Sequence, residues 1–252
     1  MEIILKDLSY FKYLSNININ FKENMIYGLY GKHADYLIKI LNKDITNYKG
    51  EIISDKEYSS FIISDDDYVF YTTNVKDEFH FIADNYGLDN GNIRQNAVEI
   101  FYKLNIDEDL YDRDIVTLSR SEKYLVKICL GLFLDSDLII FKNIFNGLDL
   151  KNIRILKTLI KNISSQKIII FLDDDSNILY NETDYVYIFK NDKVVLFGST
   201  NDIFTDVKRL NVLKIKVPYL SDIAYKVKQK KGIKLIYRKD VRDIMKDIYR
   251  NV

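Results

Sequence analysis

Residues 28–36, GLYGKHADY, have the residue types and the spacing that could hold a phosphate group. A strand-like apolar run precedes them and a helix-like run follows, which is the order of the phosphate-binding loop G-x-x-x-x-G-K-[ST]. Such a loop uses backbone N–H groups, a helix N-terminus and a lysine on the phosphate oxygens. This chain keeps Gly28 and Gly31. The last glycine, the lysine and the hydroxyl residue of the pattern are replaced by His33, Ala34 and Asp35.

These replacements remove the groups that bind phosphate and metal. Ala34 carries no charge for the β- and γ-phosphates, and Asp35 has a carboxylate in place of the hydroxyl that holds Mg²⁺. We expect Asp35 to cap a helix over about residues 36–42, which would put a negative charge where phosphate would sit, with no cation close by. Lys32 could enter as a substitute cation, but a loop lysine is more often simply solvated.

Composition excludes several classes of protein. The 252 residues carry 37 basic and 37 acidic side chains, so the chain lacks the basic excess typical of a nucleic-acid partner. The single cysteine, Cys129, sits among apolar residues, so we expect a buried thiol, no disulfide framework and a reducing cytoplasm. We see no signal peptide, and no apolar run approaches the roughly 18–20 residues of a membrane span.

The pattern of apolar residues predicts an α/β fold. Residues 16–20 alternate Asn and Ile, which is typical of a half-buried strand. The continuous apolar runs 138–141 and 168–172 are typical of strands buried in a parallel sheet. Strands that alternate with helices indicate a parallel core. We predict further strands at 2–5, 25–29, 50–54, 60–64, 184–189 and 194–197, and helices within 75–104, 119–135 and 150–163.

Taken in order, these segments resemble the nucleotide-binding domain of ABC transporters. Residues 117–122, TLSRSE, lie where that family has its LSGGQ signature. Residues 138–149, LIIFKNIFNGLD, resemble its Walker B strand and D-loop. Residues 168–174 fall at the strand that ends in the family's switch histidine, and residues 192–199, DKVVLFGS, resemble its DGKIVxxGxP hairpin. The resemblance covers essentially the whole chain.

The C-terminal segment narrows the resemblance to one group. Residues 217–225, VPYLSDIAY, and 231–233, KGI, resemble the C-terminal extension of the ATPase subunits of energy-coupling-factor (ECF) importers, where it helps hold two ATPase subunits together. The resemblance implies a P-loop NTPase fold with a RecA-like parallel sheet core, an antiparallel β subdomain and a helical insertion at about 75–135. We expect an ABC ATPase-like domain at 1–205 and a dimerising C-terminal helical extension at 206–252.

Catalysis in that family needs groups that this chain lacks. The acid that binds Mg²⁺, the glutamate that acts on the attacking water and the switch histidine are replaced by Lys142, Asn143 and Asp173. A lysine repels the metal ion, and an asparagine cannot accept a proton as a carboxylate does. Asp173 would repel phosphate unless Lys142 paired with it, and the trio 173–175 is more simply a solvated loop. We expect no catalytic residue and no metal site.

The other nucleotide contacts of the family are partly kept. Ser119 stays at the signature, where Arg120 and Ser121 replace two glycines, and Arg120 could still reach a phosphate across a dimer. Tyr13 is the candidate for the aromatic side chain that stacks on adenine. No glutamine stands at the Gln-loop position, 63–64. The D-loop, which the family uses at its dimer interface, keeps Gly147, Leu148 and Asp149.

Three functional interpretations follow. The first is a catalytically silent subunit of an ECF-like importer, which pairs with a homologous ATPase and docks on the cytoplasmic side of a membrane subunit. The second is a regulatory or adaptor protein outside transport. The third is a nucleotide-binding module with a pocket rebuilt around Lys32 and Lys142. The family uses ATP and Mg²⁺, but phosphoryl transfer depends on charge neutralisation, so we predict that this chain is inactive. Its expected place is the inner face of the cell membrane.

Overall fold

A six-stranded sheet forms the framework of the computed structural model, which describes residues 1–64, 70–88, 90–146, 148–233, 235 and 239–251. The strand order is β5-β6-β7-β3-β8-β9, and all neighbours are parallel except β8 and β9. The strands of this sheet are β3 (Ile26–Tyr30), β5 (Ser60–Ser64), β6 (Leu138–Lys142), β7 (Ile168–Leu172), β8 (Tyr185–Lys190) and β9 (Lys193–Ser199). The predicted parallel α/β core is therefore confirmed.

The continuous apolar runs place core residues on both faces of this sheet. In β6, Ile139 and Phe141 belong to one buried cluster, while Leu138 and Ile140 belong to the other. Side chains alternate along a strand, so a strand covered on both faces must be apolar at every position. Helices α4 (Arg120–Phe133), α5 (Leu150–Ile163) and α6 (Ser176–Glu182) cover the first face, and α1 (Ala34–Leu41) and a second sheet cover the other.

The second sheet has the order β2-β1-β4 and is antiparallel. Its strands are β1 (Glu2–Tyr10), β2 (Leu14–Lys22) and β4 (Lys49–Ser54). Ile17 and Ile19 are buried and the asparagines at 16 and 18 are exposed, as the alternation predicts. β1 is longer than the predicted 2–5 because a register shift between Leu5 and Leu8 lets the strand continue past a polar pair.

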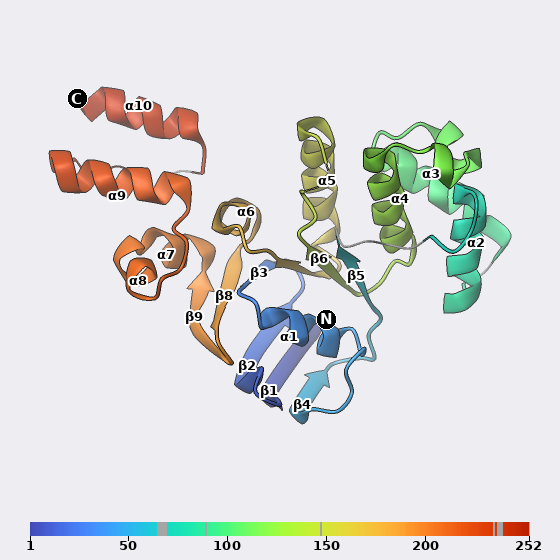
Figure 1. Ribbon diagram of the computed structural model, residues 1–252, viewed down its shortest axis with the longest axis horizontal. Coiled ribbons are helices and arrows are strands. Elements are labelled where there is room, and N and C mark those ends of the chain that lie inside the picture. The colour runs from blue at the N-terminus through green and yellow to red at the C-terminus, as the bar shows by residue number, and fades with distance from the viewer. Residues whose placement is uncertain (65–69, 89, 147, 234, 236–238, 252) are drawn as a thin grey trace.

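A helical insertion lies beyond the free edge of β5 (Figure 1). It contains α2 (Val75–Tyr86), α3 (Ile93–Lys103) and α4. The start of α4 is fixed by a capping box, in which Ser119 Oγ accepts from the Glu122 amide and the Glu122 carboxylate accepts from the Ser119 amide. Cys129 of this helix is fully buried, as expected.

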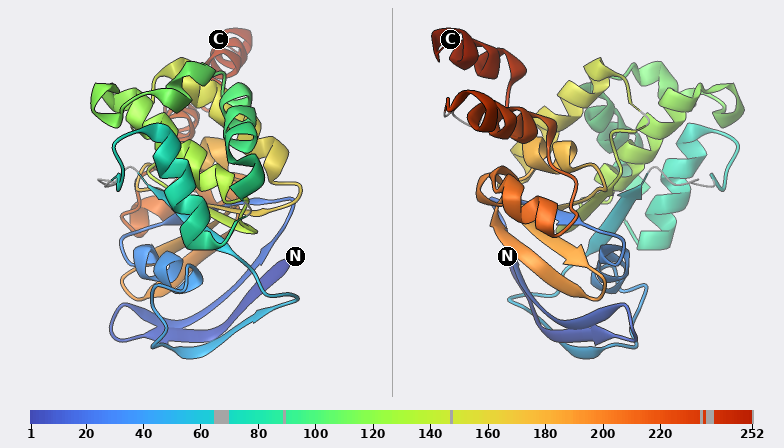
Figure 2. Two further views of the ribbon diagram at one scale, coloured as in Figure 1. Left: turned by 90° about the vertical axis from the view of Figure 1, so that its right-hand side faces the viewer. Right: turned by 60° about the vertical axis from the view of Figure 1, so that its left-hand side comes forward.

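The C-terminal segment is helical and lies at the far side of the sheet from this insertion (Figures 1 and 2). Its helices are α7 (Thr200–Thr205), α8 (Val207–Val212), α9 (Tyr219–Lys231) and α10 (Val241–Asn251). A small apolar cluster that includes Leu220 and Ile244 joins α9 to α10. In the part of the chain that the structure describes, no helix has the length and apolarity to cross a bilayer.

Candidate functional site

The loops that follow β3, β6 and β7 meet at the carboxyl ends of these strands, where α/β proteins commonly bind ligands. They enclose a pocket of about 300 Å³. The predicted phosphate-loop, Walker B and switch positions are therefore brought together. The described residues that line the pocket are Gly31, Lys32, Asp35, Tyr36, Lys39, Lys142, Asn143, Leu172, Asp173 and Asp174.

An ion-pair network in this pocket joins the first turn of α1 to the end of β6. One carboxylate oxygen of Asp35 lies 3.0 Å from Lys142 Nζ, and the other lies 2.9 Å from Lys39 Nζ. The Asp35 and Lys142 side chains are only 25% and 23% exposed. Charges shielded in this way interact more strongly than a solvated surface pair. We expected no cation beside Asp35, and that expectation is wrong.

The protonation of Asp35 reflects the same contacts. Burial acts to raise the pKa of its carboxyl group, but hydrogen bonds from Lys39 and Lys142, together with their charges, outweigh burial and lower that pKa from its ordinary value. Asp35 is therefore a carboxylate at neutral pH. The pocket as a whole is electrically balanced, because three lysines and three aspartates line it.

Asp35 does not cap α1, contrary to the prediction. The helix begins at Ala34, and the N-cap position is His33, whose side chain makes no capping hydrogen bond. His33 already has helical backbone angles, φ −79° and ψ −12°, so the turn starts two residues earlier than the predicted start at residue 36. Asp35 lies within the first turn, where its charge still favours the helix dipole.

Packing alone accounts for the two retained glycines of the loop. Gly31 has φ +110°, and a Cβ atom there would collide with the Phe189 carbonyl oxygen of β8. At Gly28 a Cβ atom would lie 3.0 Å from Thr183 Oγ1. Gly31 therefore needs glycine for the close approach of β8, whereas Gly28 would accept a Cβ atom only if the Thr183 side chain shifted. Packing thus gives both glycines a role without phosphate.

The aromatic residue predicted to stack on adenine lies beside the loop but already has a ring partner. The Tyr13 and Tyr36 rings are stacked, with centroids 4.0 Å apart and an interplanar angle of 16°. The Tyr13 carbonyl oxygen also lies 3.0 Å from His33 Nδ1. One face of Tyr13 is thus occupied by a side chain of α1. An adenine ring would have to displace Tyr36 or use the other face.

The acidic trio after β7 is not the solvated loop that we predicted. Asp173 is buried, and its carboxylate accepts a hydrogen bond of 2.7 Å from the Asp175 amide. Asp175 in turn caps α6 by accepting from the Asn177 amide. Only Asp174 is exposed. Asp173 lines the same pocket as Lys142, and the expected pairing of these two residues stays a prediction.

The backbone at the position of the family's catalytic glutamate suits the residue that this chain has there. Asn143 has φ +52°, in the left-handed region, and its amide donates to the Leu172 carbonyl at 3.0 Å. Asparagine is among the few side chains that adopt this region readily. A glutamate at this position would be strained.

Among the described residues, Ser119 and Arg120 of the signature-like segment and Leu148 and Asp149 of the D-loop do not line this pocket. Ser119 is committed to the capping box of α4, and Arg120 is exposed in its first turn. Asp149 caps α5 by accepting from the Asn152 amide at 2.8 Å, and Leu148 is half-buried. Gly147 lies outside the described residues. A role of these residues at a dimer interface stays a prediction.

Sequence reasoning missed Lys39 and Tyr36 as members of the site. Lys39 is four residues after Asp35, and that spacing on a helix was a usable signal for the ion pair. The contact with Lys142 could not be found this way, because it joins residues 107 positions apart (142 − 35). Lys32 is exposed and lines the pocket without an ion pair among the described residues.

Comparison with known proteins identifies the relatives of this chain. No protein-family model matches it. It is 23% identical over 225 residues, covering 82% of this chain and 84% of the relative, to a protein of Listeria monocytogenes described as an ABC transporter ATP-binding protein. It is also 28% identical over 230 residues to the energy-coupling factor transporter ATP-binding protein EcfA1 of Mycoplasmopsis synoviae. This match covers 84% of this chain and 85% of the relative.

A solved structure has the same fold. It is cbiO1 of Clostridium perfringens, described as part of the ABC transporter complex cbiONQ. The two structures superpose with a TM-score of 0.69 at 21% sequence identity, over 88% of this chain and 97% of cbiO1. The fold is therefore that of an ABC ATPase domain, as the resemblance implied.

The ion pair predicts an energetic coupling that a double-mutant cycle can measure. Asp35→Asn and Lys142→Met should each lower the free energy of unfolding, and the cycle should give a coupling of about 1–3 kcal/mol, because the pair is mostly shielded from water. The exposed pair Lys226–Asp222 on α9 is the matched control and should give less than about 1 kcal/mol. Urea unfolding supplies all the values.

The coupling also has a predicted pH dependence. The folded-state pKa of Asp35 is lowered, so the contribution of this carboxylate is present above its unfolded-state pKa, near pH 4, and is lost as the pH falls through the folded-state pKa. A coupling energy that is near zero at neutral pH, or that does not decrease in acid, contradicts this account.

Proposed function

We propose that this chain, whose homologues are ABC transporter ATP-binding proteins, is the catalytically silent ATPase-like subunit of an ECF-like importer. It pairs with a competent homologous ATPase and lies at the inner face of the membrane on a transmembrane subunit. Its contribution is structural, because it supplies half of an ATPase dimer and a docking surface without hydrolysing ATP itself. One relative is named as an ATP-binding protein of an energy-coupling factor transporter, EcfA1.

The observation that carries the proposal of silence is the contact of 3.0 Å between Asp35 and Lys142. In the family that the chain resembles, these two positions hold Mg²⁺ between a hydroxyl and an acid. Here the two side chains form an ion pair, so the lysine neutralises the Asp35 carboxylate, which would otherwise be the metal ligand at this position. The same contact argues against a pocket rebuilt around Lys142, because its ammonium group is already engaged.

The electrically balanced pocket supports this view. A nucleoside triphosphate carries several negative charges, which P-loop proteins neutralise with a lysine and Mg²⁺. Here Ala34 supplies no charge, and the lysines that line the pocket are offset by aspartates. Binding a triphosphate would require breaking the ion pairs of Asp35 without a replacement partner for it.

The signature-like segment supports silence in the second half-site as well. Glu122 holds its carboxylate at the N-terminus of α4, bound to the Ser119 amide and to Arg113 at 2.6 Å. The hydrogen bonds with Ser119 and Arg113 lower the pKa of Glu122 to about 2, so it is charged at neutral pH. A partner's phosphate would meet a negative charge in place of free amides.

Nucleotide binding tests the proposed silence. Isothermal titration calorimetry of the chain with MgATP should show no binding at about 1 mM. The combined variant Ala34→Lys, Asp35→Ser and Lys142→Asp restores the lysine, the hydroxyl and the acid, and should bind MgATP at least about tenfold more tightly. Ala34→Lys alone is the matched control, because it leaves the Asp35–Lys142 pair intact, and it should still not bind. Micromolar affinity of the unmodified chain, or its own ATP hydrolysis, contradicts the proposal.

Affinity purification tests the proposed partners. The tagged chain, solubilised with mild detergent from its native membranes, should co-purify with an ATPase homologue that has intact nucleotide motifs and with a polytopic membrane protein. Recovery of the ATPase homologue without any membrane protein would favour the adaptor interpretation and contradict a role in transport. This result is independent of the nucleotide measurement.

A further inference from the structure

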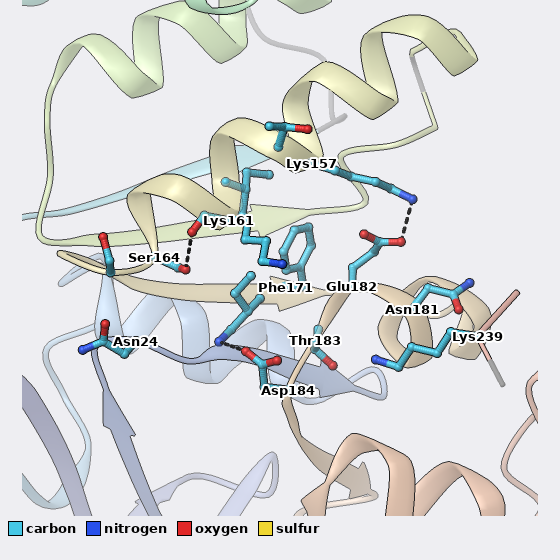
Figure 3. A pocket seen from close by; sticks show the side chains of 14 residues that line it. Asn24, Lys157, Lys161, Ser164, Phe171, Asn181, Glu182, Thr183, Asp184 and Lys239 are labelled. Carbon is cyan, nitrogen blue, oxygen red and sulfur yellow. Dashed lines mark hydrogen bonds and ion pairs between the residues drawn. The ribbon is translucent and has the colours of Figure 1, made fainter. Parts of the chain in front are cut away.

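A second cavity, of about 580 Å³, lies away from the nucleotide-like pocket (Figure 3). It is bounded by α5, the end of α6 and Lys239, which lies shortly before α10. It reaches the amino ends of β3 and β8, because Ile26 is the first residue of β3 and Asp184 directly precedes β8. The nucleotide-like pocket is at the opposite, carboxyl end of β3. The two sites therefore share no described lining residue.

Three lysines and two acids line this cavity, and both acids are already engaged. Lys157 Nζ lies 2.6 Å from Glu182, whose side chain is 15% exposed. Asp184 accepts a hydrogen bond of 2.9 Å from the Ile26 amide, which fixes it to the start of β3. In the described part of the chain, no ion pair joins either acid to the other two lysines, Lys161 and Lys239.

Those two lysines, Lys161 of α5 and Lys239 of the C-terminal segment, have no ion-pair partner among the described residues. Figure 3 shows both side chains extending into the cavity from different elements. Burial lowers the pKa of Lys239, against the weaker opposing effect of Asp184 and Glu182. The Lys239 ammonium group is also 5.6 Å from the centre of the Tyr180 ring. Both lysines are exposed to solvent, so an anion that enters the cavity can reach their ammonium groups.

The remaining lining residues define what kind of anion fits. The side-chain amides of Asn24 and Asn181 make no hydrogen bond within the described residues and are available to phosphate or hydroxyl oxygens. Phe171 and Ile160, both nearly fully buried, supply an apolar floor. The hydroxyl groups of Thr158 and Ser164 donate to backbone carbonyls and are less available.

We propose that this cavity binds a small organic phosphate, with Lys161 and Lys239 on the phosphate group and the organic part against Phe171. The volume lies within the range of about 300–1,000 Å³ that is typical of small-molecule sites. Two separated cations with nearby amide donors match a dianion, and the apolar floor matches a planar or aliphatic body. The ligand joins α5 of the ATPase-like domain to the C-terminal segment, so its binding restrains the position of that segment. This inference does not rest on the proposed transport role.

Phenyl phosphate is a suitable probe because it combines a dianion with a planar apolar ring. In isothermal titration calorimetry it should bind the intact chain with a Kd below about 1 mM. Replacement of both cations, Lys161→Ala with Lys239→Ala, should weaken binding at least about tenfold, because two charge-assisted hydrogen bonds are lost. Lys151→Ala is the matched control, since this exposed lysine on α5 does not line the cavity, and it should bind as the unmodified chain does.

Two further probes separate the contribution of the negative charge from that of the apolar ring. Benzyl alcohol, which lacks the charge, and inorganic phosphate, which lacks the ring, should each bind more weakly than phenyl phosphate. Absence of phenyl phosphate binding, or equal affinity in the double lysine variant, overturns the proposal. Equal affinity for inorganic phosphate overturns the assignment of an organic ligand. Thermal unfolding of the variants confirms that any loss of binding is local.

Discussion

The contact between Asp35 and Lys142 is the interaction on which the character of this molecule depends. It joins the first turn of α1 to the end of β6, two strands away in the sheet, across the place where an ABC ATPase holds its metal ion. We propose that these two side chains replace the hydroxyl and the acid that the resembled family has at these positions. The ion pair attaches α1 to β6 directly. A site that is held together by its own charges has no need of nucleotide to be stable.

The residues around the Asp35–Lys142 ion pair also have structural roles within the folded chain. Gly31 remains because β8 passes too close for a side chain, and Asn143 remains compatible with a left-handed backbone. Tyr13 and Tyr36 stack on each other beside the loop. Each of these features has a reason within the folded chain. The ABC ATPase framework is thus maintained by packing and hydrogen bonding, while the residues at its functional positions have local structural roles.

Several elements could be predicted from the sequence because their signals are local. The apolar runs of β6 and β7 and the helical spacing of α4 needed no knowledge of distant residues. The order of the motif-like segments was enough to predict that residues 31–35, the end of β6 and the end of β7 meet at one pocket. The helical extension after residue 206 was also found, although its role at an interface is a proposal.

The predictions that failed concern contacts between distant residues and the conformation of short segments. Nothing near Asp35 in the sequence reveals that Lys142 is its partner. The start of α1 was placed too late because His33 adopts helical angles without a capping side chain. The trio at 173–175 was expected to be solvated, but Asp173 turns inward and Asp175 caps the short helix α6. In a chain with one proline, asparagine and aspartate serve both as loop residues and as caps, and composition does not separate the two roles.

A crystal structure determined after soaking with Mg²⁺ and a non-hydrolysable ATP analogue would show whether the Asp35–Lys142 ion pair keeps nucleotide out of the pocket. We expect that Lys142 Nζ stays in contact with the Asp35 carboxylate and that no triphosphate lies beside Ala34. A triphosphate bound to the amides of residues 31–35, with Lys142 moved away from Asp35, would contradict it.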